Sequence, residues 1–71
     1  MLGLYDVVRL KADDLRFGVK HSFIGAVVDV HGNGDAFTVE FIDDDGKTIE
    51  DALLVDYHAE DLELVTAAAD L

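Results

Sequence analysis

The residues best suited to bind a metal ion are three consecutive aspartates and a glycine, Asp43–Gly46. A calcium loop needs oxygen ligands at alternating positions over about twelve residues, with a bidentate glutamate at its end. Here the aspartates are adjacent, and Glu50 and Asp51 follow too soon to complete such a set. Because Asp-Gly is a favoured pair for a tight hairpin turn, we expect a solvated turn at this place and no metal site.

Side chains that could act as nucleophiles or as further metal ligands are few. The chain has no cysteine, and its single serine, Ser22, lies outside any Gly-X-Ser-X-Gly turn. His21, His31 and His58 have no spacing that forms a local metal motif. Carboxylates are abundant, but general acid catalysis requires one that is buried and has a raised pKa. We therefore expect a protein that is not an enzyme and holds no cofactor.

The strongest signal in the composition is negative charge. The chain has 16 acidic and five basic residues, and its net charge is −11. Residues 1–20 carry four bases and three acids, whereas residues 21–71 carry Lys47 and thirteen acids. Such a field repels nucleic-acid phosphates and attracts basic proteins. Solubility of a small apolar domain, or a salt-adapted host, would explain the same composition without a partner.

The length of 71 residues fits a single domain spanning 1–71. A chain this short hides only about 60% of its unfolded surface, and without cysteines it must be stabilised by packing or by self-association. The sequence has no signal-peptide pattern and no apolar run of membrane-spanning length. We therefore expect a cytoplasmic protein that does not bind membranes.

Hydrophobic periodicity predicts five short β-strands. The β-prone run 22–31 and the alternating run 36–42 indicate a hairpin around Gly32-Asn33-Gly34, which lacks the helix and lysine of a phosphate-binding loop. Further strands are expected at 4–10, at 47–55 with a bulge at Glu50-Asp51, and at 62–65. Gly25 within the longest run predicts a bulge or a tight bend.

The segments between these strands lack clear periodicity. Residues 11–21 are expected to form an ordered loop whose apolar side chains, Leu15, Phe17 and Val19, fold back on the core. One short helical turn is expected at 56–61, with Asp56 as its cap. The domain core would then span 4–65, and residues 66–71 would be frayed or weakly helical.

These elements predict an all-β fold, a small five-stranded antiparallel SH3-like barrel with one short helical turn before the last strand. A barrel removes the free strand edges that a flat sheet exposes. The alternative is a flat sheet that dimerises through an edge strand.

Several fragments, taken in order, are similar to one known family: 5–10, 25–30, 39–48, 52–54 and 59–62. Together they resemble a family of short bacterial domains, domain of unknown function 4926, over residues 4–65. The resemblance implies an SH3-like fold and no established activity, and it suggests an antitoxin or immunity role. Two features depart from the family pattern: Tyr57-His58 replaces a usual proline, and Glu50-Asp51 is an insertion.

The predicted function is a non-enzymatic interaction module that binds a basic protein through an acidic face. The partner-binding residues would be Asp43, Asp44, Asp45, Glu50 and Asp51, with Glu60, Asp61 and Glu63 at the rim.

Several alternatives to this prediction remain. A homo-oligomer could cover an apolar strand or the alanines at 67–69, and an inhibitor could mimic a nucleic-acid backbone with its acids. An aromatic groove could bind a proline-rich peptide, and its residues would be Tyr5, Phe17, Phe23, Phe37, Phe41 and Tyr57. Direct nucleic-acid binding is not expected, because only Arg9, Lys11, Arg16 and Lys20 could serve it.

Overall fold

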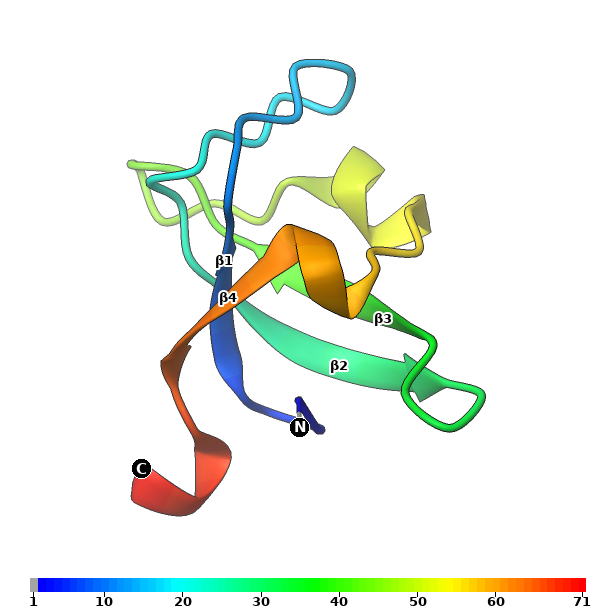
Figure 1. The fold of residues 1–71 in the computed structure, drawn as a ribbon. Helices are drawn as coiled ribbons and strands as arrows, with labels where there is room; N and C mark the ends of the chain where they lie inside the picture. Colours follow the sequence, from blue (N-terminus) through cyan, green and yellow to red (C-terminus); the bar gives the residue numbers. More distant parts are fainter. Residues whose placement is uncertain (1) are drawn as a thin grey trace.

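The fold is built on a four-stranded antiparallel sheet with the strand order β3-β2-β1-β4 (Figure 1). The computed structural model describes residues 2–71. Its elements are β1 (Val7–Leu10), β2 (Gly25–His31), β3 (Ala36–Phe41), the 3-10 helices η1 (Glu50–Leu54) and η2 (Ala59–Asp61), β4 (Leu62–Thr66) and the 3-10 helix η3 (Ala68–Asp70). The predicted all-β class is confirmed, with four strands instead of five. Within residues 2–71 no helix is long and apolar enough to cross a membrane.

Strand β1 lies inside the sheet because it pairs with strands from both later parts of the chain. Its Val8 is opposite Gly25 of β2 and Leu64 of β4. Alternation along β1 buries Val8 and Leu10 on one face, as their spacing predicts. Leu4, which lies within the strand expected at 4–10, precedes β1 and is half exposed.

Strands β2 and β3 form the predicted hairpin. His31 is opposite Ala36, and the connecting Gly32 and Gly34 have φ angles of 62° and 95°. Glycine adopts this left-handed conformation without a Cβ clash, which explains its use in the turn. The register of β2 shifts between Val27 and Asp29, where a bulge bends the strand.

Gly25 marks the closest approach between β2 and its neighbour β3. A Cβ atom at this position would lie 2.7 Å from the carbonyl oxygen of Glu40 and 2.7 Å from Cγ1 of Val39. It would also lie 2.9 Å from Cδ1 of Phe41. Only glycine therefore allows β2 to pack this closely against β3 while it also pairs with β1.

The hydrophobic core lies against the inner face of the sheet and is completed by residues outside the strands. Phe41 and Tyr57 pack edge to face with ring centroids 5.4 Å apart, a favoured aromatic geometry. Tyr57 is held beside β3 by an isolated bridge to Phe37. The buried cluster comprises Val8, Leu10, Val19, Phe23, Val27, Phe37, Val39, Phe41, Ala52, Tyr57 and Leu62.

The predicted strand at 47–55 is wrong. Pairing beside the end of β3 is limited here to an isolated bridge between Ile42 and Thr48 and two hydrogen bonds, from the Asp43 amide to the Lys47 carbonyl and from the Ile49 amide to the Phe41 carbonyl. The chain then forms η1 at the place where a fourth strand with a bulge was expected.

The spacing of apolar residues explains this helix. A 3-10 helix has three residues per turn, so Ile49, Ala52 and Val55 lie on one side, and all three contribute to the core or pack against it. Glu50 and Asp51 occupy the first turn of η1 and are exposed. Acidic residues and alanine are also depleted in strands, which favours the helix over the expected bulge.

The connection from β1 to β2 is ordered, as predicted. Asp14 and Val19 form an isolated antiparallel bridge that closes the turn between them. Val19 is fully buried and Phe17 packs against the core. Leu15, which we expected to fold back, is 82% exposed because it lies in the turn closed by this bridge.

The predicted helical turn before the last strand is η2, whose N-cap position is occupied by His58, without a side-chain hydrogen bond, and not by Asp56. After β4 the chain continues into η3, in the segment expected to be frayed or weakly helical.

Asp6 connects the beginning and the end of the described chain. Its Oδ2 accepts a hydrogen bond from the Gly3 amide at 2.8 Å, and its Oδ1 accepts one from the Ala68 amide at 2.8 Å. The hydrogen bond from Ala68 is the main reason why the pKa of Asp6 lies below its ordinary value. The carboxylate form of Asp6 therefore stabilises the attachment of η3 to the turn before β1.

The substitution Gly25→Ala should destabilise the fold by about 1–3 kcal/mol, because a neighbouring strand must move to admit the methyl group. Urea unfolding measures the effect. Gly3→Ala is the matched control, since a Cβ at Gly3 meets nothing within 4 Å. Equal stability of the two variants would contradict the close approach at Gly25.

The substitution Asp6→Ala should lower stability at neutral pH by about 1–2 kcal/mol, since it removes hydrogen bonds to a charged acceptor. The folded-state pKa of Asp6 is lowered from 3.8, so its contribution is present above that pH and is lost as the pH falls through the folded-state pKa. The stability difference between wild type and Asp6→Ala should therefore narrow in acid. Asp70→Ala, at an exposed aspartate, should show neither effect.

Candidate functional site

The eight acidic residues predicted to bind a partner lie in three segments. Asp43, Asp44 and Asp45 follow β3, Glu50 and Asp51 begin η1, and the remaining three, Glu60, Asp61 and Glu63, lie on η2 and at the start of β4. In Figure 1 the turn after β3 lies at the left edge of the view, whereas helix η1 lies to the right of centre. The structure therefore distributes the predicted acidic face over separate segments.

The segment after β3 is the tight turn that its Asp-Gly pair predicts. Asp43 Oδ1 accepts hydrogen bonds from the amides of Asp45 at 2.9 Å and Lys47 at 3.0 Å. Gly46 has a φ angle of 78°. The Asp43 carboxylate is thus used to fold the turn, whereas the Asp44 and Asp45 side chains are exposed.

Glu63 differs from the other predicted acids because it has a basic partner. Arg9 Nη2 on β1 lies 3.0 Å from Glu63 Oε1, and both side chains are 48% exposed. The hydrogen bond from Arg9 lowers the pKa of Glu63. Among residues 2–71, the other seven predicted acids have no basic side chain within 4.0 Å.

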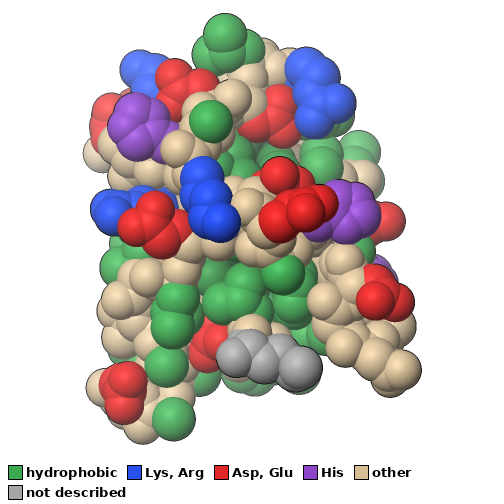
Figure 2. Space-filling model, viewed as in Figure 1, with side chains coloured by type: hydrophobic (Ala, Val, Ile, Leu, Met, Phe, Trp, Pro, Cys, Tyr) green, Lys and Arg blue, Asp and Glu red, His purple; other side chains and the backbone are tan. Residues whose placement is uncertain are grey.

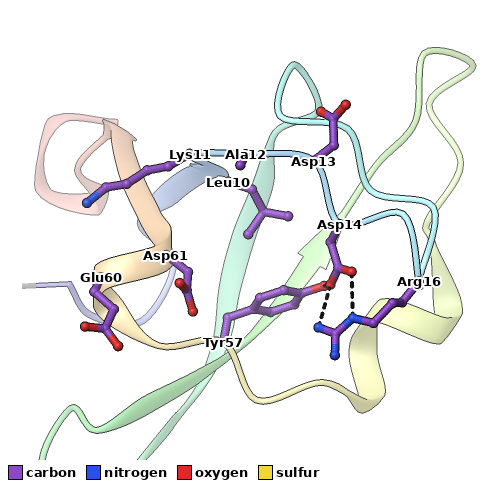
Figure 3. A pocket seen from close by; sticks show the side chains of 9 residues that line it. All are labelled: Leu10, Lys11, Ala12, Asp13, Asp14, Arg16, Tyr57, Glu60 and Asp61. Atoms are coloured by element: carbon purple, nitrogen blue, oxygen red, sulfur yellow. Dashed lines mark hydrogen bonds and ion pairs between the residues drawn. The ribbon is translucent and has the colours of Figure 1, made fainter.

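A groove of about 360 Å³ lies between the β1–β2 connection and η2 (Figure 3). Asp13, Asp14 and Arg16 line it from the connection, and Glu60 and Asp61 line it from η2. Two of the predicted rim acids are therefore placed opposite two acids that the sequence-based prediction did not include.

Tyr57 projects across this groove toward Asp14 (Figure 3). Its hydroxyl donates to Asp14 Oδ2 at 3.5 Å, and Arg16 Nε lies 3.1 Å from Asp14 Oδ1. Burial, followed by the charge of Asp14, raises the pKa of Tyr57 to about 12. Tyr57 is therefore neutral at physiological pH and supplies an apolar ring with a hydrogen-bond donor to the groove.

The three histidines each have a separate polar partner. His21 Nδ1 lies 2.7 Å from Asp13 Oδ1, His31 Nε2 lies 2.8 Å from Thr38 Oγ1, and His58 Nδ1 lies 3.2 Å from a backbone oxygen. Over the described range 2–71, no group of three or more histidines and acids is arranged to hold a metal ion.

Sequence reasoning missed the groove because its two sides are far apart in the chain. Asp14 and Tyr57 are separated by 43 positions, and no local pattern indicates that they meet. The available signals were the Asp13-Asp14 pair in an ordered loop and the inclusion of Tyr57 among the aromatic residues of a peptide groove. Neither signal indicates that η2 faces the β1–β2 connection.

The raised pKa of Tyr57 can be measured in a Tyr5→Phe variant, in which Tyr57 is the sole tyrosine. Its phenolate absorbance should titrate with a midpoint near 12, because burial and Asp14 disfavour the charged form. Circular dichroism of the same samples verifies that the chain stays folded. In a folded chain, a midpoint at the ordinary tyrosine value of 10.0 would contradict the buried contact.

Comparison with known proteins gives one match. No curated protein and no solved structure matches this chain. A family model described as "Domain of unknown function (DUF4926)" matches residues 4–62, which cover most of the sequence. The family resemblance noted from the ordered fragments is thereby confirmed, and the chain belongs to the DUF4926 family.

Proposed function

We propose that this protein is a non-enzymatic interaction module that binds a basic protein partner through its acidic surface. One observation supports this proposal most directly. Of the eight acids predicted from the sequence, seven have no basic partner within 4.0 Å among residues 2–71. These acids would attract lysine and arginine side chains of another protein over a distance and accelerate the encounter.

The uneven placement of the bases supports this electrostatic mechanism. Arg9 is paired with Glu63, and Arg16 is paired with Asp14. On the face shown in Figure 2, Lys and Arg side chains gather in the upper half, where Figure 1 shows the β1–β2 connection. Acids outside this region therefore keep a negative field that the chain's own bases do not neutralise.

The groove offers a place where an approaching basic segment could be retained. Lys11 and Arg16 also line it, with Arg16 paired to Asp14, whereas Glu60 and Asp61 have no basic partner among the described residues. Leu10 and Tyr57, each 4% exposed, form its floor. A lysine or arginine on an extended segment would meet the carboxylates of Glu60 and Asp61, which would retain it after long-range attraction has guided the approach.

Hydrogen bonds within the chain lower the pKa of three carboxyl groups, Asp6, Asp13 and Glu63. A general acid at neutral pH needs a shift in the opposite direction. A binding role, such as that of an antitoxin or immunity protein, requires no such group.

We also infer that the fold is of the SH3-like barrel kind. Pairing of β1 with both β2 and β4, and a 3-10 turn before the last strand, support this inference. The bridges Ile42–Thr48 and Phe37–Tyr57 attach the segment after β3 where a fifth strand would lie.

The partner can be identified by affinity capture from the native host and then measured with purified protein. Binding should weaken as salt increases, because ions screen the attraction. Glu60→Gln combined with Asp61→Asn should weaken it by about tenfold at low salt, through two lost charge contacts. The control, Asp29→Asn with Asp70→Asn, removes the same charge from exposed positions outside the predicted site.

Two results would contradict the proposal. The first is an affinity for the captured partner that does not change between low and high salt. The second is an equal loss of binding in the groove variant and in the control variant.

A further inference from the structure

The sheet has two edge strands, and only one of them is covered. Along the edge of β3, Phe37 and Tyr57 exchange backbone hydrogen bonds of 2.7 and 2.9 Å, and the Ile49 amide donates to Phe41. At the other edge, β4 has β1 as its neighbour in the sheet. The Leu62 amide donates to the Ala59 carbonyl of η2; within the part of the chain described, no other backbone hydrogen bond joins β4 to a segment other than β1.

The free edge of β4 carries few of the features by which natural sheets prevent pairing. Edge strands are commonly protected by lysine, proline, inward-pointing charges or β-bulges. The β4 sequence LELVT has no lysine or proline, and the register shift opposite Val7 and Val8 places a bulge at Val65. Its Leu64 and Val65 are 49% and 44% exposed. Alternate backbone amides and carbonyls of β4 are therefore available to another strand.

We propose that two copies of this chain associate by antiparallel pairing of their β4 strands about a two-fold axis. The pairing would join two four-stranded sheets into one continuous sheet. This surface is distinct from the acidic groove, and the proposal does not depend on the function proposed above.

The distribution of charge indicates that the strand pairing with the free edge of β4 comes from a second copy of this chain. Glu63 is the single ionisable residue of β4, and Arg9 of the same chain already neutralises it at 3.0 Å. In a two-fold pairing centred on Leu64, Glu63 of one copy faces Val65 of the other, so that like charges do not meet. In a chain with a net charge of −11, β4 is thus a surface where two copies can approach without opposing acids.

The area of a stable dimer interface is larger than strand β4 can provide by itself. A stable interface covers about 800 Å² on each partner, roughly a sixth of the 4570 Å² surface of this chain. A five-residue strand is only about 17 Å long. Helix η3 directly follows β4 and ends beside Leu71, which is 80% exposed. We therefore include η3 in the interface.

Salt separates this association from partner binding. Two copies that each carry −11 repel one another, and added salt screens that repulsion. Dimerisation should strengthen with salt, whereas binding of a basic partner should weaken. Because the two responses to salt have opposite signs, one measurement can contradict the dimer without contradicting partner binding, and the reverse.

Sedimentation equilibrium over about a hundredfold range of wild-type concentration, at low and high salt, tests the proposal. The expected result is a monomer–dimer equilibrium that is stronger at high salt. Val65→Lys should weaken the dimer by about tenfold or more, because lysine protects the edge. The control Leu54→Lys makes the same charge change at a residue on η1 that is 87% exposed, and it should not weaken the dimer.

Amide hydrogen exchange of the wild-type chain provides a second test that needs no substitution. Protection of the β4 amides should rise with protein concentration, while protection of the β2 amides should change less. A strict monomer at high concentration and high salt would overturn the proposal. It would also be overturned by an equal effect of the two lysine variants, or by a dimer whose β4 amides gain no protection.

Discussion

The close packing of backbones at Gly25 is the constraint on which the rest of the fold depends. Strand β2 must pair with β1 through Val8 and with β3 through Phe41 at this one residue. The space for a side chain is already filled by atoms of Glu40, Val39 and Phe41. Because β2 pairs with both neighbouring strands at Gly25, the sheet can curve around the hydrophobic core. The strands alone would leave part of that core exposed. Loop and 3-10 segments complete that core, with Val19, Phe23, Ala52 and Tyr57 as their buried members.

The groove follows from the same arrangement. Tyr57 is both a core residue, packed against Phe41, and a groove residue that reaches Asp14. Its position is set by the bridge to Phe37 on β3, so the edge pairing of β3 brings η2 opposite the β1–β2 connection. The contacts of Tyr57 thus cover the edge of β3, complete the core and form the groove that we assign to a basic partner.

Charge gives the molecule two different kinds of surface. The turn after β3 and the beginnings of η1 and η2 carry acids that lack basic partners among residues 2–71. Strand β4 carries a single acid, which Arg9 neutralises. Electrostatic repulsion between copies therefore opposes contact over the acidic segments and is weakest along β4. The same imbalance that favours a basic partner restricts where self-association can occur.

The sequence by itself determined the four strands of the sheet, the β2–β3 hairpin, the turn at Asp43–Gly46 and family membership. These features depend on local rules: alternation of apolar residues, glycine at positive φ, and Asp-Gly in a turn. Only the tertiary structure decided that 47–55 is largely a 3-10 helix, because its apolar residues at every third position matter only when a core lies beside them. The groove likewise required the meeting of Asp14 and Tyr57, which are 43 positions apart. Local propensity contains no information about such a contact, because long-range packing sets it.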